Sequence, residues 1–194
     1  MTGKDHHLIL KAKAGDSGAY GQLVRKYQNK VLYLAFDLCS NYDDAKDVAQ
    51  DTFVRAFEKI HQFQERSQFS TWLYRIAVNL SMDLHRKRQN RQHRSLQDHE
   101  FDIDKKQMMT SDVETPLTLV EKNEQRVQID RALNCLSPNQ RTATVLKYFH
   151  QMNSREISGI MGCSEGTVRN HIFRALKNLK RQLKKPIPDI SNHT

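Results

Sequence analysis

The chain has 194 residues and a formal net charge of +9, which indicates attraction to a polyanion, either nucleic acid or an anionic membrane surface. No apolar run approaches the roughly 18 residues that span a bilayer, and we expect no secretory signal in the charged first residues. The three cysteines lack metal-binding spacing, so we expect small buried residues in a reducing cytoplasm rather than a catalytic or redox thiol: Cys39, Cys135 and Cys163.

The N-terminal half repeats apolar residues at the helical period, which predicts an all-α fold. We expect three amphipathic helices that bury their apolar stripes against one another in a domain spanning residues 1–95. The stripes run over Tyr20–Leu38, after a turn at Gly15–Ser17, and over Ala45–Ile60 and Phe69–Leu84. The middle helix carries an acidic and polar opposite face: Asp44, Asp47, Gln50, Asp51, Arg55 and Glu58.

The composition then changes twice. Residues 84–96 contain arginine and lysine but no acid, whereas residues 97–124 are rich in acids, have no sustained apolar period and contain Pro116. This pattern predicts a flexible acidic linker over residues 96–122. Helical order resumes in a second small domain over residues 123–185, where Ser137-Pro138 fits a helix start, and residues 186–194 form a tail.

The segment Arg155–Leu183 predicts a helix-turn-helix, because Gly162 separates a short helix from a longer one that Ser164 caps. At the helical period the apolar residues of the longer helix share one arc and the opposite face is basic, and residues 166–188 contain no acid. A recognition helix in the DNA major groove has this geometry. Arginine can bind a guanine edge, asparagine an adenine and phenylalanine a thymine methyl, while lysines meet phosphates. We therefore predict DNA binding rather than a merely solvated basic face.

Two blocks together resemble the conserved domains of bacterial sigma factors. The segments DDAKDVAQDTFVRAFEKIHQF and FSTWLYRIAVNLSMDLHR resemble the second domain of these proteins, and ALNCLSPNQRTATVLKYFHQMNSREISGIMGCSEGTVRNHIFRALKNLKRQL resembles their fourth. The short two-domain layout is similar to that of the extracytoplasmic-function group, in particular its envelope-stress members. The resemblance implies a subunit that binds core RNA polymerase, recognises a two-element promoter and helps to melt it for a stress or envelope regulon. It implies no enzymatic activity, cofactor, metal or small-molecule substrate.

The resemblance also implies the site residues. The surface that binds polymerase is expected at Asp44, Asp47, Gln50, Asp51 and Arg55, with an ordinary solvated helix face as the alternative. The loop Phe63–Gln68 and the helix after it match the part that captures a flipped base of the minus-ten element. We expect Tyr74, Arg75 and Asn79, on or near the face opposite the apolar stripe, to contact the flipped base. The cations expected to hold the DNA backbone are Arg86, Lys87 and Arg88. Trp72 could stack on a base, but its place in the apolar stripe favours core packing.

The minus-thirty-five element is expected on the second helix of the helix-turn-helix, at Arg169, Asn170, His171, Phe173, Arg174 and Lys177. Three positions depart from the envelope-stress pattern. Asn170 and His171 stand where Ser and Arg are common, which alters the expected base preference. Ser158 stands where an alanine usually packs between the two helices.

The resemblance implies a membrane-bound anti-sigma factor as a further partner. It leaves two readings of the acidic linker open, a segment that imitates nucleic acid in the RNA exit path of the polymerase or a solubilising tether. Two other function classes fit less well. A stand-alone regulator would need a ligand-binding, receiver or dimerisation domain in the N-terminal half. An enzyme acting on nucleic acid would need metal ligands that converge on one site, and the sequence offers only the aspartates at 43–51 on one exposed helix face.

Overall fold

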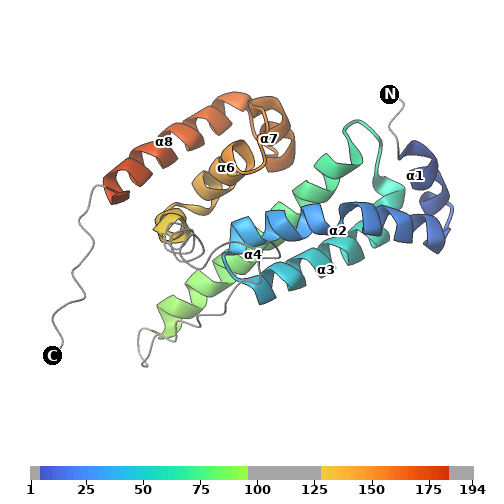
Figure 1. Cartoon of the computed structure of the whole chain (residues 1–194), viewed down its shortest axis with the longest axis horizontal. Helices are drawn as coiled ribbons and strands as arrows, with labels where there is room; N and C mark the ends of the chain where they lie inside the picture. The colour runs from blue at the N-terminus through green and yellow to red at the C-terminus, as the bar shows by residue number, and fades with distance from the viewer. Residues whose placement is uncertain (1–4, 96–127, 184–194) are drawn as a thin grey trace, which may run out of the picture.

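The computed structural model describes residues 5–95 and 128–183, and all regular structure in these two ranges is helical (Figure 1). The predicted all-α fold is therefore confirmed, while the expected linker and tail lie outside the described residues. The N-terminal half contains α1 (His6–Lys13), α2 (Ser17–Cys39), α3 (Tyr42–Lys59), the 3-10 turn η1 (Ile60–Gln62) and α4 (Phe69–Ser95). The C-terminal half contains a helix over residues 128–134, α6 (Pro138–Tyr148), α7 (Ser154–Met161) and α8 (Glu165–Leu183).

Side-chain caps start the helices where the sequence changes pattern. The α2 helix begins after the expected turn, because Asp16 Oδ1 accepts a hydrogen bond from the Ala19 amide at 2.9 Å. In the same way Asn41 caps α3, and Ser137 caps α6 with Pro138 at its first position. Each cap satisfies an amide that has no partner inside the helix. The α1 helix was not predicted, since its eight residues are too few to show a clear apolar period.

The N-terminal core lies between α2, α3 and α4. Leu23, Leu34 and Leu73 are fully buried there. At one end of this core the Trp72 ring packs against Phe63 and Phe69, with ring centroids 5.2 and 5.6 Å apart. Trp72 is partly buried and packs against the core, which agrees with the expectation that it belongs to the core.

The C-terminal core lies between α6, α7 and α8, where Leu146, Ile157 and Val168 are fully buried. The expectation of three buried cysteines was wrong. Cys135 is exposed, because it lies in the turn between the helix over 128–134 and α6, while the other two cysteines are half-buried.

The two halves pack against each other, α7 on α4 and α6 on α2. Arg141 of α6 lies in this interface and is only 5% exposed. Its guanidinium donates hydrogen bonds to the Asp37 carbonyl oxygen at 3.2 Å, to Ser40 Oγ at 2.7 Å and to Asn134 Oδ1 at 2.5 Å. His150 Nε2 lies 3.1 Å from Asp37 Oδ2. The sequence predicted two domains on a tether and left their arrangement open, and the structure shows them in contact.

We expect Leu34→Ala to lower the free energy of unfolding by about 2–5 kcal/mol, because the truncation leaves a cavity in a close-packed core. Its neighbour Tyr33 is 64% exposed, so Tyr33→Ala is the matched control, with a change within about 0.5 kcal/mol. Urea unfolding followed by circular dichroism measures both. Equal effects of the two substitutions would contradict this account of the core.

We expect Arg141→Ala to separate the two halves, because it removes the hydrogen bonds that join α6 to α2 and leaves buried acceptors without their donor. Small-angle X-ray scattering should then show a larger radius of gyration, while circular dichroism shows the same helix content. The exposed Arg131, substituted by alanine, is the control. An unchanged radius of gyration would mean that the α4–α7 packing alone holds the halves together.

Candidate functional site

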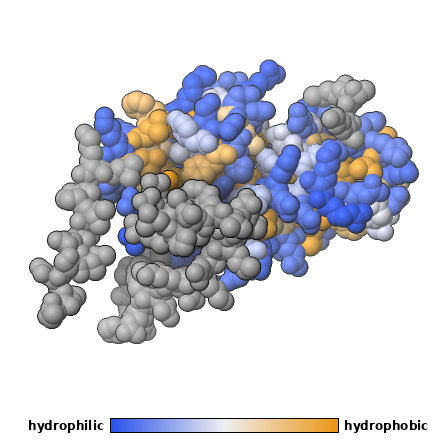
Figure 2. All heavy atoms as spheres, viewed as in Figure 1, coloured by the Kyte–Doolittle hydropathy of each residue, from blue (hydrophilic) through white to orange (hydrophobic). Residues whose placement is uncertain are grey.

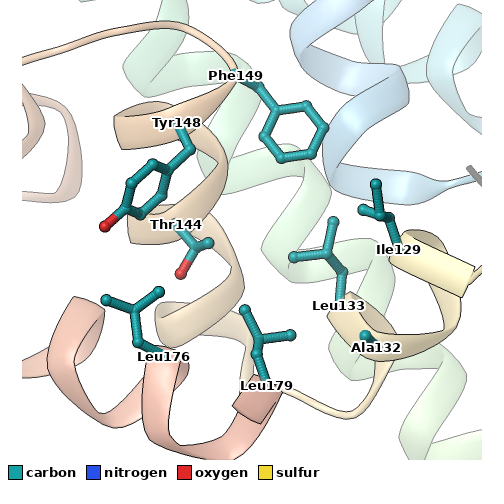
Figure 3. Close-up of a pocket in the computed structure, with 8 residues that line it drawn as sticks. All are labelled: Ile129, Ala132, Leu133, Thr144, Tyr148, Phe149, Leu176 and Leu179. Atoms are coloured by element: carbon teal, nitrogen blue, oxygen red, sulfur yellow. The ribbon is translucent and has the colours of Figure 1, made fainter. Parts of the chain in front are cut away.

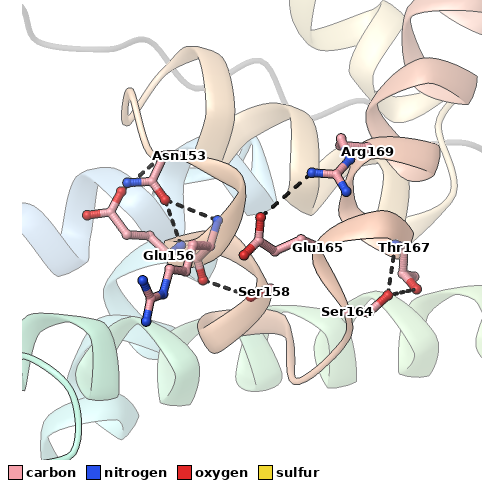
Figure 4. A network of polar contacts seen from close by, with 8 residues as sticks. Asn153, Glu156, Ser158, Ser164, Glu165, Thr167 and Arg169 are labelled. Carbon is pink, nitrogen blue, oxygen red and sulfur yellow. Dashed lines mark hydrogen bonds and ion pairs between the residues drawn. The ribbon is translucent and has the colours of Figure 1, made fainter.

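The helix-turn-helix has the local geometry that the sequence predicted (Figure 4). Asn153 Oδ1 accepts hydrogen bonds from the Arg155 and Glu156 amides at 3.0 Å, and the Glu156 carboxylate accepts one from the Asn153 amide at 2.9 Å. This capping box starts α7. Gly162 ends it in the left-handed conformation, with φ of 65°. Ser164 Oγ then accepts from the Thr167 amide at 3.1 Å and starts α8.

The α8 helix presents its basic face outward. Val168 and Ala175 are fully buried, whereas Phe173 is 68% exposed. Of the residues expected to read the minus-thirty-five element, only His171 is half-buried, and these five are exposed: Arg169, Asn170, Phe173, Arg174 and Lys177. An exposed phenylalanine between cations is costly in water and suits contact with an apolar group such as a thymine methyl.

Two side chains near this face are engaged locally. Arg169 lies 3.7 Å from Glu165, one turn earlier on α8. Ser158 Oγ donates to the Arg155 carbonyl oxygen at 2.8 Å. The hydroxyl that departs from the family's alanine is therefore satisfied within its own helix, and the departure does not disturb the turn.

The minus-ten candidates divide into buried and exposed residues. Tyr74 is 8% exposed, and its ring centroid lies 6.4 Å from that of His150 in the C-terminal half. Burial raises the pKa of Tyr74. The expectation that Tyr74 lies on an open face was therefore wrong, because α4 is covered on that side. Arg75 and Asn79 are exposed as expected, and Arg75 borders the turn at Gly162.

Basic side chains follow along the C-terminal part of α4. Arg86 and Lys87 are exposed, and Arg86 forms an ion pair with Asp83. Arg88 forms an ion pair with Asp44 of α3. Burial, followed by the positive charges of Arg141 and Arg88, lowers the pKa of His85. This end of α4 is thus an exposed cationic surface suited to a nucleic-acid backbone.

The acidic face of α3 is open, except at its start. Asp47, Gln50, Asp51 and Arg55 are exposed, and none of these four forms an ion pair with another residue in 5–95 or 128–183. Asp44 is different, because it is half-buried and paired with Arg88. Asp44 therefore has a structural partner within the protein, which the sequence did not reveal.

Two apolar residues on this same face, Val54 and Phe57, are exposed although the sequence did not predict it. Val54 is 50% exposed and lies between Asp47, Gln50 and Asp51 at the helical period. Phe57, which was assigned to the buried stripe, is also about half exposed, although its ring packs on Tyr20 at 4.9 Å. The sequence does contain a signal for the exposure of Val54, because this apolar residue lies in the middle of the polar arc of α3 at the helical period. The face thus combines acids with apolar groups, as protein-binding surfaces commonly do.

An apolar groove lies on the C-terminal half, between the helix over 128–134, α6 and α8 (Figure 3). Its volume is about 220 Å³. An apolar patch is visible over α6 and α8 on the surface (Figure 2). Leu176, on the apolar arc of α8, borders this groove and is 44% exposed. The lining residues are Ile129, Ala132, Leu133, Thr144, Tyr148, Phe149, Leu176 and Leu179.

The described part of the chain carries neither a metal-ligand cluster nor a membrane-spanning helix. In residues 5–95 and 128–183, no three histidine, cysteine, aspartate or glutamate side chains converge as metal ligands. No helix in this part of the chain is both long and apolar enough to cross a membrane.

Comparison with known proteins identifies both halves. The family described as Sigma-70 region 2 matches residues 23–91, and Sigma-70, region 4 matches residues 126–179. The chain is 32% identical to the RNA polymerase sigma-H factor of Pseudomonas aeruginosa, over 93% of this chain and 94% of that protein. It is 32% identical to the ECF RNA polymerase sigma factor SigW of Bacillus subtilis, over 91% and 95% of the two chains. For the ECF RNA polymerase sigma-E factor of Haemophilus influenzae the identity is 33%, over 92% and 95%.

Solved structures show the same fold. The sigma factor RpoE of Bartonella quintana, crystallised with the anti-sigma factor NepR, superimposes with a TM-score of 0.64 at 25% identity, over 87% of this chain and 98% of that one. CnrH, solved with the cytosolic domain of CnrY, gives a TM-score of 0.65 at 24% identity, over 92% and 96%. With both regions matched in order and relatives aligned along nearly the whole length, the chain belongs to the extracytoplasmic-function (ECF) family of RNA polymerase sigma factors.

Proposed function

We propose that the protein is an alternative sigma factor that binds core RNA polymerase in the cytoplasm, recognises a two-element promoter and promotes DNA melting for a stress or envelope regulon. The observation that carries the proposal is the pair of exposed faces on one chain. The α8 face is basic and carries Phe173, Arg174 and Lys177, while the α3 face is acidic and carries Asp47 and Asp51. A phosphate backbone attracts the first face and repels the second, so the second suits a protein partner.

In this proposal α8 enters the major groove of the minus-thirty-five element. The loop Phe63–Gln68 captures a base of the minus-ten element, with Arg75 and Asn79 beside it and Arg86 and Lys87 on the backbone. Use of Tyr74 requires the two halves to separate, because His150 covers it in the docked arrangement. Polymerase binding would supply the free energy for this separation.

An anti-sigma factor is the second proposed partner. The Bartonella relative is bound to such a factor in its solved structure. Here the apolar groove beside α8 and the half-exposed Val54 on α3 leave apolar surface uncovered on both halves. Exposed apolar surface of this kind marks protein-binding sites, and a factor that covers both would hide the α3 face from polymerase.

A stand-alone regulator that binds an operator without polymerase is the alternative. The open acidic face on α3 disfavours it, because such a regulator has no use for that face. Run-off transcription with purified core polymerase on genomic promoter fragments separates the two functions. We expect a promoter-specific transcript only when the protein is added. Footprinting of duplex DNA by the protein alone, without such a transcript, would replace the proposal by the alternative.

We expect Arg174→Ala and Asp51→Ala to affect different steps. Loss of an arginine contact to a base costs about 1–3 kcal/mol, so Arg174→Ala should weaken holoenzyme binding to the upstream element by roughly 5- to 150-fold without changing affinity for core. Asp51→Ala should weaken association with core, measured by fluorescence anisotropy, without changing upstream recognition in holoenzyme assembled at saturation. Equal loss of both activities in both variants would show misfolding and undercut the separate roles.

A further inference from the structure

The loop Phe63–Gln68 is anchored at its two ends. Phe63 is buried in the aromatic cluster, and its amide donates to the Ile60 carbonyl oxygen at 3.1 Å. At the other end the Gln68 carbonyl oxygen accepts from the Trp72 amide at 3.2 Å. Between these anchors, residues 64–67 form no backbone–backbone hydrogen bond with any residue in the described ranges, and Ser67 Oγ donates to the Gln68 carbonyl oxygen at 3.4 Å. The middle of the loop therefore needs side-chain contacts to keep one conformation.

Glu65, in the middle of the loop, has a backbone conformation that is unfavourable for a residue with a side chain. Its φ is +55°, in the left-handed region that favours glycine. A non-glycine residue pays free energy for this conformation and keeps it only where its surroundings impose it. Contacts of the Glu65 side chain with α1 can impose this backbone conformation.

Two side chains of α1 contact the Glu65 carboxylate. His6 Nδ1 lies 2.6 Å from Oε2, and Lys13 Nζ donates to Oε1 at 3.4 Å. Hydrogen bonding by His6, opposed by partial burial and assisted by Lys13, lowers the pKa of Glu65. Lys13 Nζ also lies 5.7 Å from the centroid of the Phe63 ring, at the anchored end of the loop.

The α1 helix is placed to give this support. It packs against η1 at the start of the loop, and Figure 1 shows it beside the connection from η1 to α4. His6 and Lys13 are seven positions apart, so they share one face of α1 at the helical period. The family match begins only at residue 23, which leaves α1 without an assigned role.

We propose that α1 braces the minus-ten loop, with His6 and Lys13 as positioning residues that hold Glu65 and thereby set the loop in the conformation that receives a flipped base. This inference rests on the proposed function. A loop ordered before binding does not lose conformational entropy when it captures the base, so its affinity for the opened strand is higher. His6 and Lys13 act through Glu65 and do not themselves contact the base.

The test uses holoenzyme assembled from core polymerase and the full chain. The probe is a fluorescent single-stranded oligonucleotide with the non-template minus-ten sequence of a promoter identified by run-off transcription. We expect the double variant His6→Ala with Lys13→Ala to bind this strand about tenfold more weakly, since ordering even one residue has a free energy of that size. Affinity for core and for the upstream duplex should not change.

The matched control is His7→Ala with Lys11→Ala. These two residues have the same side-chain types on the same helix, are exposed and form no ion pair with residues in the part of the chain that the structure describes. The control variant should bind the strand as the wild-type protein does. A second variant exchanges the charges, with Glu65→Lys combined with His6→Glu and Lys13→Glu. It should recover most of the strand binding, which a loss of folding would not allow.

Three outcomes would overturn the brace. The double variant could bind the strand as tightly as the wild type, it could lose core binding in parallel with strand binding, or the charge exchange could fail to restore the strand affinity. Wild-type holoenzyme that does not bind the strand at all would instead overturn the proposed function and the brace with it. Strand binding lost in the double variant and recovered in the charge exchange supports the proposal.

Discussion

The burial of α4 on two sides is the constraint on which the rest of the structure depends. One stripe of α4, with Leu73 and Ala77, packs into the N-terminal core. A second stripe at the helical period, with Tyr74, Val78 and His85, faces the other half, where the Tyr74 ring contacts His150. Burial, and then the positive charge of Arg141 from the other half, lowers the pKa of His85. The helix expected to meet the opened strand thus also holds the two halves together. The same surface cannot be covered by α7 and occupied by DNA, so DNA binding at this stripe and docking of the halves exclude each other.

The helix-turn-helix depends less on this packing. Its form follows from short-range hydrogen bonds: the capping box at Asn153, the left-handed Gly162 and the cap at Ser164. Such contacts join residues only a few positions apart and need no distant partner. The α8 face that they orient stays open in the docked arrangement, while the Tyr74 surface is closed. Of the two predicted DNA-binding surfaces, the one on α8 is therefore open in the docked arrangement, while in the other Arg75 and Asn79 are exposed and Tyr74 requires a rearrangement.

Exposed charge of opposite sign distinguishes the α3 surface from the surfaces of α8 and of the far end of α4. The protein is strongly basic overall, yet α3 keeps exposed acids around the apolar Val54. Under the proposed function this sign difference would direct nucleic acid to α8 and the far end of α4, and a basic protein surface to α3. Asp44 shows the limit of such reasoning, because it belongs to the acidic pattern but pairs with Arg88 inside the protein. A carboxylate that already forms an ion pair within the protein attracts a basic partner less strongly than an exposed carboxylate without an ion pair.

The sequence by itself determined the all-α class, the turn at Gly15–Ser17, the helix starts at Ser137 and Ser164, and the outward basic face of α8, because the helical period and the caps are local properties. Its two-block pattern also identified the family. Only the tertiary structure decided what depends on contacts between distant residues: the burial of Tyr74 under His150, the exposure of Cys135, the pairing of Asp44 with Arg88, the insertion of Arg141 against α2 and the contact of α1 with the loop at Glu65. No short-range pattern encodes which side of α4 receives a second cover, since the covering residues lie about seventy positions further along the chain.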